Sequence, residues 1–321
     1  MPSAPIRSVT VFGAGTIGAS WAALFAARGL DVRLYDRSAE ALASGCKKAI
    51  RILTSWEDVY APAAIERIHL CPDPDSALAN AAFVQESVLE DYAVKRAAHE
   101  TIERFAPADA LVASSTSGLL ASRMQESWTH PERFLIAHPF NPVHLIPLVE
   151  LVGGPRTAAE SLRKAHELYT ALGKVPVTLN QEVPGHLANR LATAVWREAI
   201  DLVARGVASL EDVDKALCAG PGLRWAFMGQ HLTYHLAGGP GGYRNFFEHL
   251  GPALEVYMAD LARWDRVPEA AKREVLEQMD AHLAGRGVAE LERWRDAKLV
   301  ELAKHLYAHE PAELTTHEHV V

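Results

Sequence analysis

The sequence has little cysteine: Cys46, Cys71 and Cys218 are the only thiols in 321 residues, and no CxxC spacing occurs. So few thiols provide no disulfide framework of the kind that holds small secreted domains together. No apolar run is long enough to span a bilayer. The stretch before the first strand-like run is too short and polar for a signal peptide. These absences predict a reduced, cytoplasmic protein that does not enter a membrane.

The sequence also lacks an excess of positive charge and a recognisable metal motif. Its formal net charge is −8, from 32 Lys and Arg residues against 40 Asp and Glu residues. A chain with this charge balance is not expected to bind nucleic acid or anionic membranes. No HExxH motif occurs, and we predict no bound metal.

The first half of the chain alternates short strand-like runs with helical stretches. Strands are predicted at residues 9–12, 32–36, 82–85, 111–114, 134–137, 148–152 and 175–179. Helical patterns lie between several of them, up to residue 28 and again at 92–105 and 158–172. This order predicts an α/β fold with a Rossmann-type, doubly wound parallel sheet over residues 1–183.

The pattern changes to helices after Val183. Pro184 suits the first turn of a helix, where no backbone N–H is needed, and Leu187 and Leu191 begin an apolar series at helical spacing. Helical patterns continue to His305, interrupted by Gly-rich stretches. We therefore place a domain boundary near residue 183 and predict an all-helical second domain over 184–321.

Three glycines form the motif G-x-G-x-x-G between the first strand and the first helix. Gly13 permits a tight turn, Gly15 lets the backbone approach a pyrophosphate, and Gly18 allows the helix to pack closely on the sheet. The helix N-terminus offers free N–H groups to phosphate. The pattern predicts a dinucleotide site, and its alternative is a merely structural βαβ turn.

Asp36, at the end of the second strand, bears on which dinucleotide binds. A carboxylate there suits the ribose 2′-hydroxyl of NAD and repels the 2′-phosphate of NADP. Arg37 beside it favours NADP. Because the carboxylate stands at the strand end itself, we predict NAD as the cofactor.

Polar residues follow the later strands in a characteristic order. They are Glu86, Glu90 and Lys95, then Ser117, then His138-Pro139-Phe140-Asn141-Pro142, then Glu150, and finally Pro184-Gly185-His186-Leu187-Ala188-Asn189. Together these residues resemble the 3-hydroxyacyl-CoA dehydrogenase family across nearly the whole chain. The one departure noted is Pro139, which stands where the family has an aromatic residue, and it removes no chemical group.

The resemblance implies that His138 is the catalytic base and Glu150 its orienting carboxylate. Oxidising a secondary alcohol needs a proton acceptor, and histidine titrates near neutrality. A lone acid in an apolar run is costly to bury unless it is paired, which supports a functional Glu150. Ser117 and Asn189 would contact the hydroxyl or carbonyl region of the substrate, although both residue types commonly cap turns and helices.

The same resemblance implies the remaining contacts and partners. Glu90, Lys95 and Asn141 would lie near the nicotinamide half of the cofactor. The protein would act on a small-molecule substrate and form a homodimer through its helical domain.

Residues 220–254 resemble the L-carnitine branch of the family more than its fatty-acyl-CoA branch. Carnitine is a 3-hydroxy acid with a quaternary ammonium, a cation that aromatic faces hold well. Trp225, Phe227 and Tyr234 are therefore candidate substrate-binding residues, and Arg224 is a candidate partner for the substrate carboxylate. The alternative is that these aromatic residues form the core of the helical domain or a dimer interface.

The sequence therefore predicts an NAD-dependent 3-hydroxy acid dehydrogenase that oxidises L-carnitine to 3-dehydrocarnitine. Three alternatives stay open. An L-3-hydroxyacyl-CoA dehydrogenase could use Lys47 and Lys48 to meet CoA phosphates, and the L-gulonate 3-dehydrogenase branch shares a similar Gly-Leu-Arg-aromatic stretch. A crystallin-like structural protein is the non-enzymatic alternative, and the presence of His138 and Glu150 argues against it.

Overall fold

The computed structural model describes residues 6–55 and 62–306, which divide into two compact units. The first unit contains the described residues up to Arg190, and the second contains those from Leu191 onward. Helix α7 (Ala188–Ala204) spans this division. The domain boundary near residue 183 stays a prediction.

The first unit is built on an eight-stranded sheet with the order β3-β2-β1-β4-β5-β6-β7-β8. The strands are β1 (Ser8–Phe12), β2 (Asp31–Tyr35), β3 (Ile68–Cys71), β4 (Phe83–Glu86), β5 (Leu111–Ser114), β6 (Phe134–Pro139), β7 (Leu148–Gly153) and β8 (Val175–Leu179). Neighbouring strands pair in parallel, except that β6 and β7 are antiparallel. The predicted doubly wound fold is confirmed, with one pair in the other orientation.

The antiparallel pair follows from a short connection. A parallel return needs a crossover of roughly a dozen residues or more, and residues 140–147 between β6 and β7 contain no α-helix. Strand β7 therefore turns back beside β6. The sequence prediction also missed β3, Ile-His-Leu-Cys, which is an edge strand with two exposed central residues.

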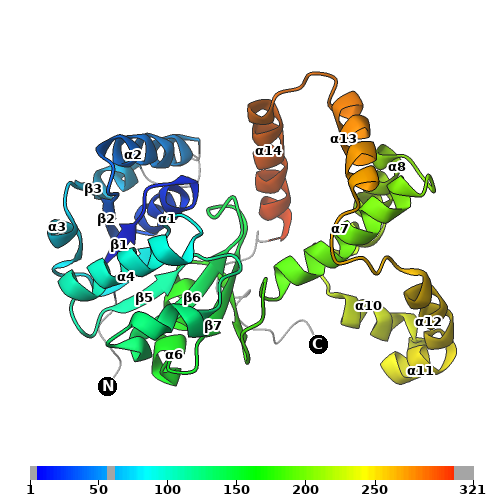
Figure 1. Ribbon diagram of the computed structural model, residues 1–321, viewed down its shortest axis with the longest axis horizontal. Helices are drawn as coiled ribbons and strands as arrows, with labels where there is room; N and C mark the ends of the chain where they lie inside the picture. Colours follow the sequence, from blue (N-terminus) through cyan, green and yellow to red (C-terminus); the bar gives the residue numbers. More distant parts are fainter. Residues whose placement is uncertain (1–5, 56–61, 307–321) are drawn as a thin grey trace. The chain divides into compact units, whose positions relative to one another are not determined.

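Helices cover both faces of the sheet (Figure 1). One core includes residues of α1 (Thr16–Ala27), α2 (Ala39–Thr54) and α6 (Ala159–Ala171), and a second core includes residues of α3 (Pro74–Leu78), α4 (Tyr92–Phe105) and α5 (Ala121–Met124). Short 3-10 turns, η1 (Pro62–Arg67), η2 (Gln125–Ser127) and η3 (Pro131–Arg133), complete the unit. Both faces being covered explains why the inner strands β4, β5 and β6 are buried along their whole length.

The strand order places the candidate residues on one edge of the sheet. The order reverses between β1 and β4, and ligands of such sheets bind outside the carboxyl ends at this point. Because β1, β2, β4, β5 and β6 are mutually parallel, the segments that follow them meet at the same edge. These segments contain Gly13, Asp36, Glu90, Ser117 and Asn141.

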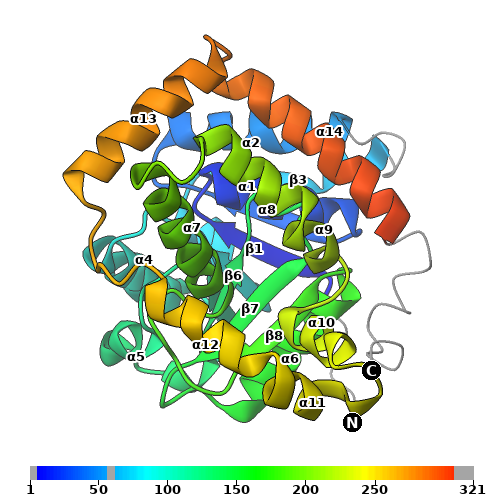
Figure 2. The ribbon, with the colours of Figure 1, turned by 90° about the vertical axis from the view of Figure 1, so that its right-hand side faces the viewer.

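The second unit is all-helical in its described part, which confirms that prediction (Figure 2). After α7 come α8 (Leu210–Ala219), α9 (Pro221–Trp225), α10 (Gln230–Ala237), η4 (Gly239–Gly241), α11 (Gly242–His249), α12 (Gly251–Asp260), α13 (Glu269–Leu283) and α14 (Val288–Leu306). Tyr234 of α10 stacks on Phe246 of α11, with ring centroids 4.3 Å apart. Across residues 6–55 and 62–306, no helix is long and apolar enough to cross a membrane.

Candidate active site

The Gly-rich turn has the geometry that a dinucleotide needs. Gly13 has φ +108°, and a Cβ added there would lie 2.7 Å from the backbone of Ser87. A Cβ on Gly18 would lie 1.8 Å from the carbonyl oxygen of Gly13, so the helix could not pack as closely. No atom lies within 4 Å of a Cβ added to Gly15, which leaves open space beside the turn. This is the position where a pyrophosphate would approach the backbone.

Two neighbouring features also fit NAD. Gly15 is the N-cap of α1 and supplies no side-chain cap, so the first amides of the helix are available to phosphate oxygens. Asp36 is held beside the turn, because its Oδ2 accepts a hydrogen bond from Ala14 N at 2.9 Å and its Oδ1 one from Ser38 N at 3.0 Å. A carboxylate held in this position disfavours a 2′-phosphate through like-charge repulsion.

Replacing Asp36 is expected to weaken the preference for NADH over NADPH. Asp36→Ala removes the negative charge that repels the 2′-phosphate of NADPH. It also removes the acceptor for the ribose hydroxyl of NADH, and that hydrogen bond is worth about 1.5 kcal/mol, or roughly tenfold in affinity. Titration of tryptophan fluorescence gives both dissociation constants. Asp36→Asn, which keeps an oxygen next to Ala14, separates the charge from the turn geometry. An unchanged ratio in both variants would show that Asp36 does not set the preference. Equal affinities of the wild type for the two cofactors, or tighter binding of NADPH, would show that Arg37 dominates.

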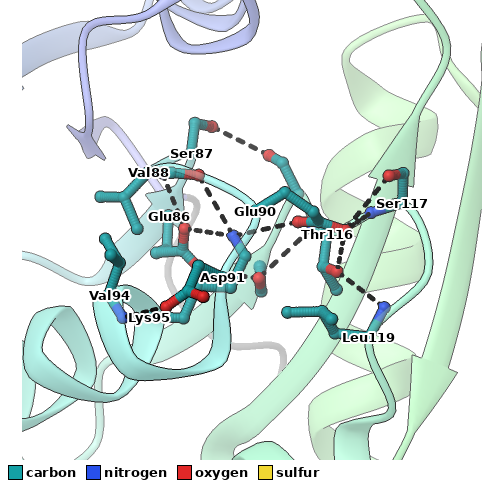
Figure 3. Close-up of polar contacts among 12 residues, drawn as sticks. Glu86, Ser87, Val88, Glu90, Asp91, Val94, Lys95, Thr116, Ser117 and Leu119 are labelled. Carbon is teal, nitrogen blue, oxygen red and sulfur yellow. Dashed lines mark hydrogen bonds and ion pairs between the residues drawn. The ribbon is translucent and has the colours of Figure 1, made fainter.

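Lys95 lies in a buried ionic cluster rather than on an open surface (Figure 3). Its side chain is 1% exposed, and its Nζ donates to Oε1 of the fully buried Glu86 at 2.8 Å. Glu86 also accepts hydrogen bonds from Val88 N at 2.8 Å, Ser114 Oγ at 2.6 Å and His99 Nε2 at 3.3 Å. Burial raises the pKa of Glu86, but the Lys95 ammonium and His99 outweigh it and lower the pKa to about 2. The carboxylate is therefore ionised at neutral pH.

Glu90 connects this cluster to Ser117. Its Oε2 lies 3.7 Å from Lys95 Nζ. Its Oε1 accepts hydrogen bonds from Thr116 Oγ1 at 2.7 Å, Ser117 N at 2.8 Å, Ser117 Oγ at 3.1 Å and Gly118 N at 3.2 Å. Asn189 Nδ2 donates to the Ser117 carbonyl at 3.0 Å. The structure thus brings together four of the predicted site residues, Glu90, Lys95, Ser117 and Asn189.

His138 and Glu150 stand directly opposite each other on the antiparallel strands β6 and β7. His138 Nδ1 and Glu150 Oε2 are 2.8 Å apart, and both side chains are buried. Burial raises the pKa of Glu150, but hydrogen bonds from His138 and from the amides of Ala188 and Leu187 lower it overall. Because an ionised carboxylate only accepts, Nδ1 of His138 carries a hydrogen, and in the neutral ring the lone pair is on Nε2.

The segment before α7 holds the other oxygen of Glu150. Leu187 N and Ala188 N donate to Glu150 Oε1 at 2.8 and 2.9 Å. The prediction that Pro184 lies in the first turn of the helix is wrong. Pro184 lies in a turn closed by a hydrogen bond from His186 N to the Val183 carbonyl, and α7 begins only at Ala188. Positive φ at Gly185 and His186 interrupts the helical path.

Sequence reasoning assigned no role to two buried residues of this site. Glu86 is an acidic residue at the end of a buried strand. An acidic residue in an apolar run was the signal that indicated Glu150, and the same signal could have indicated Glu86. His186 lies in the stretch 184–189 that supports the family resemblance, but no sequence signal indicated its contact with His138, at 5.2 Å between ring centroids, because that contact depends on the tertiary fold.

The remaining candidates are more exposed. Asn141 lies exposed in the loop after β6. Arg224, Trp225 and Phe227 are exposed in the second unit, where Trp225 Nε1 donates to Gln230 Oε1 at 2.8 Å. Tyr234 is half-buried against Phe246, so part of its role is to stabilise the helical unit.

The doubly wound sheet, the Gly-rich turn and the fixed Asp36 define an NAD-dependent oxidoreductase. The model of the 3-hydroxyacyl-CoA dehydrogenase NAD binding domain matches residues 8–183, and the model of the C-terminal domain of the same enzymes matches residues 185–278. The chain belongs to the 3-hydroxyacyl-CoA dehydrogenase family. The predicted family, enzyme class and cofactor are thereby confirmed.

Individual relatives cover nearly the whole chain. An L-carnitine dehydrogenase of a Pseudomonas species is 42% identical over 305 residues, covering 92% of each chain. One from Bacillus cereus is 40% identical over 95% of this chain and 94% of its own. The solved 5-formyl-3-hydroxy-2-methylpyridine 4-carboxylic acid 5-dehydrogenase has a TM-score of 0.82 at 28% identity, covering 95% of this chain and all of that one. The (S)-3-hydroxybutyryl-CoA dehydrogenase of Ralstonia eutropha has a TM-score of 0.64 at 25% identity, with 88% and 95% covered.

Proposed function

We propose that the protein oxidises the 3-hydroxyl group of L-carnitine to a ketone, with NAD as the oxidant and His138 as the general base. The hydrogen-bonded pair of His138 and Glu150 carries the chemical part of the proposal. The L-carnitine dehydrogenases that share about two fifths of its residues support the substrate. NAD, when bound, accepts the hydride from the carbon that carries the hydroxyl group.

His138 takes the proton that leaves the oxygen. Its Nε2 lone pair accepts the hydroxyl proton as the C–H bond breaks and the C=O bond forms. The resulting imidazolium is stabilised by the carboxylate of Glu150, which Leu187 N and Ala188 N hold in place. The imidazolium later releases its proton to water, and in the reverse reaction it returns the proton to the carbonyl oxygen.

Ser117 and Asn189 orient the substrate beside the base. Ser117 is exposed and its hydroxyl donates to Glu90, so its oxygen presents lone pairs to the substrate hydroxyl. Asn189 fixes the backbone of Ser117 through the carbonyl. Among the residues proposed near the nicotinamide, Glu90 and Asn141 are accessible, whereas the buried Lys95 acts through Glu90.

Aromatic residues of the second unit hold the trimethylammonium group in this proposal. Trp225 is 41% exposed and Phe227 58% exposed, so both residues are accessible to a ligand. Arg224 offers a bidentate fork to the substrate carboxylate. The quaternary ammonium donates no hydrogen bond, so ring faces are the partners that suit it.

The CoA alternative gains no support from Lys48. Its Nζ lies 3.5 Å from Thr16 Oγ1 at the start of α1, and it therefore faces the dinucleotide turn. A homodimer remains part of the proposal, because the helical unit exposes large apolar side chains such as Leu191, Trp196 and Trp294. A second copy would remove such surface from water.

Truncating an aromatic residue that holds the trimethylammonium group is expected to lower kcat/KM for L-carnitine roughly thirtyfold. This is the equivalent of about 2 kcal/mol for a desolvated cation–π contact. Trp225→Ala, Phe227→Ala and Tyr234→Ala are the variants, and NADH absorbance is the measurement. Phe247→Ala is the matched control, since Phe247 is 60% exposed and Phe227 58%. The same assay with L-gulonate and 3-hydroxybutyryl-CoA tests the substrate.

An uncharged 3-hydroxy acid of similar length provides the second control. Its weaker turnover should fall much less than that of L-carnitine in the three variants. Equal losses with both substrates would mean that the aromatic residues only support the fold. A wild-type preference for L-gulonate or for the CoA thioester would overturn the carnitine assignment and leave the dehydrogenase mechanism standing.

A further inference from the structure

We propose that His186 is a positioning residue of the reaction: its imidazole ring holds His138 and the Ser117 segment in place, and its backbone aims two amides at Glu150. The proposal rests on the proposed role of His138 as the base. It does not depend on which 3-hydroxy acid is the substrate.

The backbone of His186 is in an unusual conformation. Val183 to His186 form a tight turn, with Gly185 at φ +77° and His186 at φ +53°. Glycine adopts the left-handed region freely, but a residue with a Cβ rarely does. The conformation has a visible result, because the next two amides, Leu187 N and Ala188 N, both donate to Glu150 Oε1.

The side chain of His186 is 1% exposed and joins two other segments of the site. Its ring lies 5.2 Å from the ring of His138, at an interplanar angle of 47°. Its Nε2 lies 3.4 Å from the carbonyl oxygen of Thr116, the residue before Ser117. Since a carbonyl only accepts hydrogen bonds, Nε2 of His186 carries the hydrogen, and Nδ1 has none and can only accept.

This arrangement opposes folding in two ways. The left-handed backbone is strained, and Nδ1 of His186 is buried with no hydrogen-bond partner among the described residues. Glycine or asparagine would relieve the backbone, and phenylalanine would fill the space without an unpaired nitrogen. Local strain of this kind is concentrated at functional sites.

The surroundings of His186 favour its neutral form. Burial and then the charge on His138 lower the pKa of His186. A neutral ring packed on His138, with its own hydrogen directed at Thr116, restrains the base without competing with it. His186 thus connects the three parts of the site: its ring contacts His138 and Thr116, and the two amides that follow it bind Glu150.

The test compares His186→Phe and His186→Asn with wild type. His186→Phe keeps the ring volume and removes both nitrogens, and we expect kcat to fall about tenfold from misplacement of the base, with KM values within about twofold. Its melting temperature should be unchanged or higher, because the unpaired Nδ1 is gone. His186→Asn relieves the backbone but loses the ring, and its kcat should fall at least as far. His166→Phe, an exposed histidine on α6, is the control that should change nothing.

Imidazole ¹⁵N NMR tests the proposal without turnover. In wild type, His186 should appear as the neutral Nε2–H tautomer and His138 as the Nδ1–H tautomer. In His186→Phe, the His138 signals should shift or broaden as its restraint is lost. Unchanged His138 signals, a kcat within about twofold of wild type, or a kcat loss that simply follows a lower melting temperature would overturn the proposal. A wild-type enzyme inactive on 3-hydroxy acids would instead refute the proposed function, and the NMR result would still decide the role of His186.

Discussion

His138→Ala is expected to lower kcat by at least about 10²-fold, the usual scale for a positioned acid–base group. Alanine leaves no proton acceptor for the substrate hydroxyl, whereas the Gly-rich turn and Asp36 are untouched. The dissociation constant for NADH should therefore stay close to that of wild type, as measured by fluorescence titration. His166→Ala, on the exposed face of α6, is the matched control for loss of an imidazole.

Glu150→Gln extends the same test to the orienting residue. Glutamine cannot stabilise an imidazolium by charge, so kcat should fall and the acid limb of the pH–rate profile should move to lower pH. If the amides of Leu187 and Ala188 keep the glutamine oxygen as their acceptor, the glutamine NH2 faces Nδ1 of His138. It then favours the tautomer that has no lone pair on Nε2, which adds to the loss of kcat. Near-normal turnover of a folded His138→Ala variant would show that another group is the base.

Lys95→Met is expected to destabilise the protein by about 3–5 kcal/mol, because it leaves the buried carboxylate of Glu86 without its counter-ion. Both side chains are at most 1% exposed, so water cannot replace the lost charge. Urea unfolding at neutral pH measures the change. Lys164→Met, which removes a solvent-exposed partner of Glu160 at 4.0 Å, should have little effect.

The double variant Glu86→Gln/Lys95→Met should recover most of that loss of stability, since neither buried charge then remains unpaired.

The contribution of Glu86 to the free energy of unfolding depends on pH. The folded pKa of Glu86 is lowered from 4.5 to about 2, so its stabilising contribution is fully present above pH 4.5 and is lost as the pH falls through about 2. The double variant should lose less stability across this range. A single variant as stable as wild type, or a double variant no better than the single one, would contradict the ion-pair account.

Local patterns in the sequence were sufficient for much of the fold. The strands around Val9, Val112 and Leu135 are apolar runs bounded by turn residues, and such runs are buried in any sheet covered on both faces. The Gly-rich motif could be interpreted from the sequence because Gly13, Gly15 and Gly18 each meet a steric requirement of the same turn. Strand β3 escaped prediction. It is an edge strand whose two central residues are exposed, so it lacks the continuous buried run of the inner strands.

The sequence by itself determined the alternation of strands and helices, the NAD-binding turn and the presence of His138 and Glu150 in neighbouring apolar runs. Only the tertiary structure decided that these two strands are antiparallel, which sets the histidine and the carboxylate opposite each other. It also decided that Lys95 is enclosed between Glu86 and Glu90, and that His186 packs against His138. The physical reason is that periodicity and turn chemistry act among near neighbours, whereas the burial and partner of a side chain depend on segments far away in the chain.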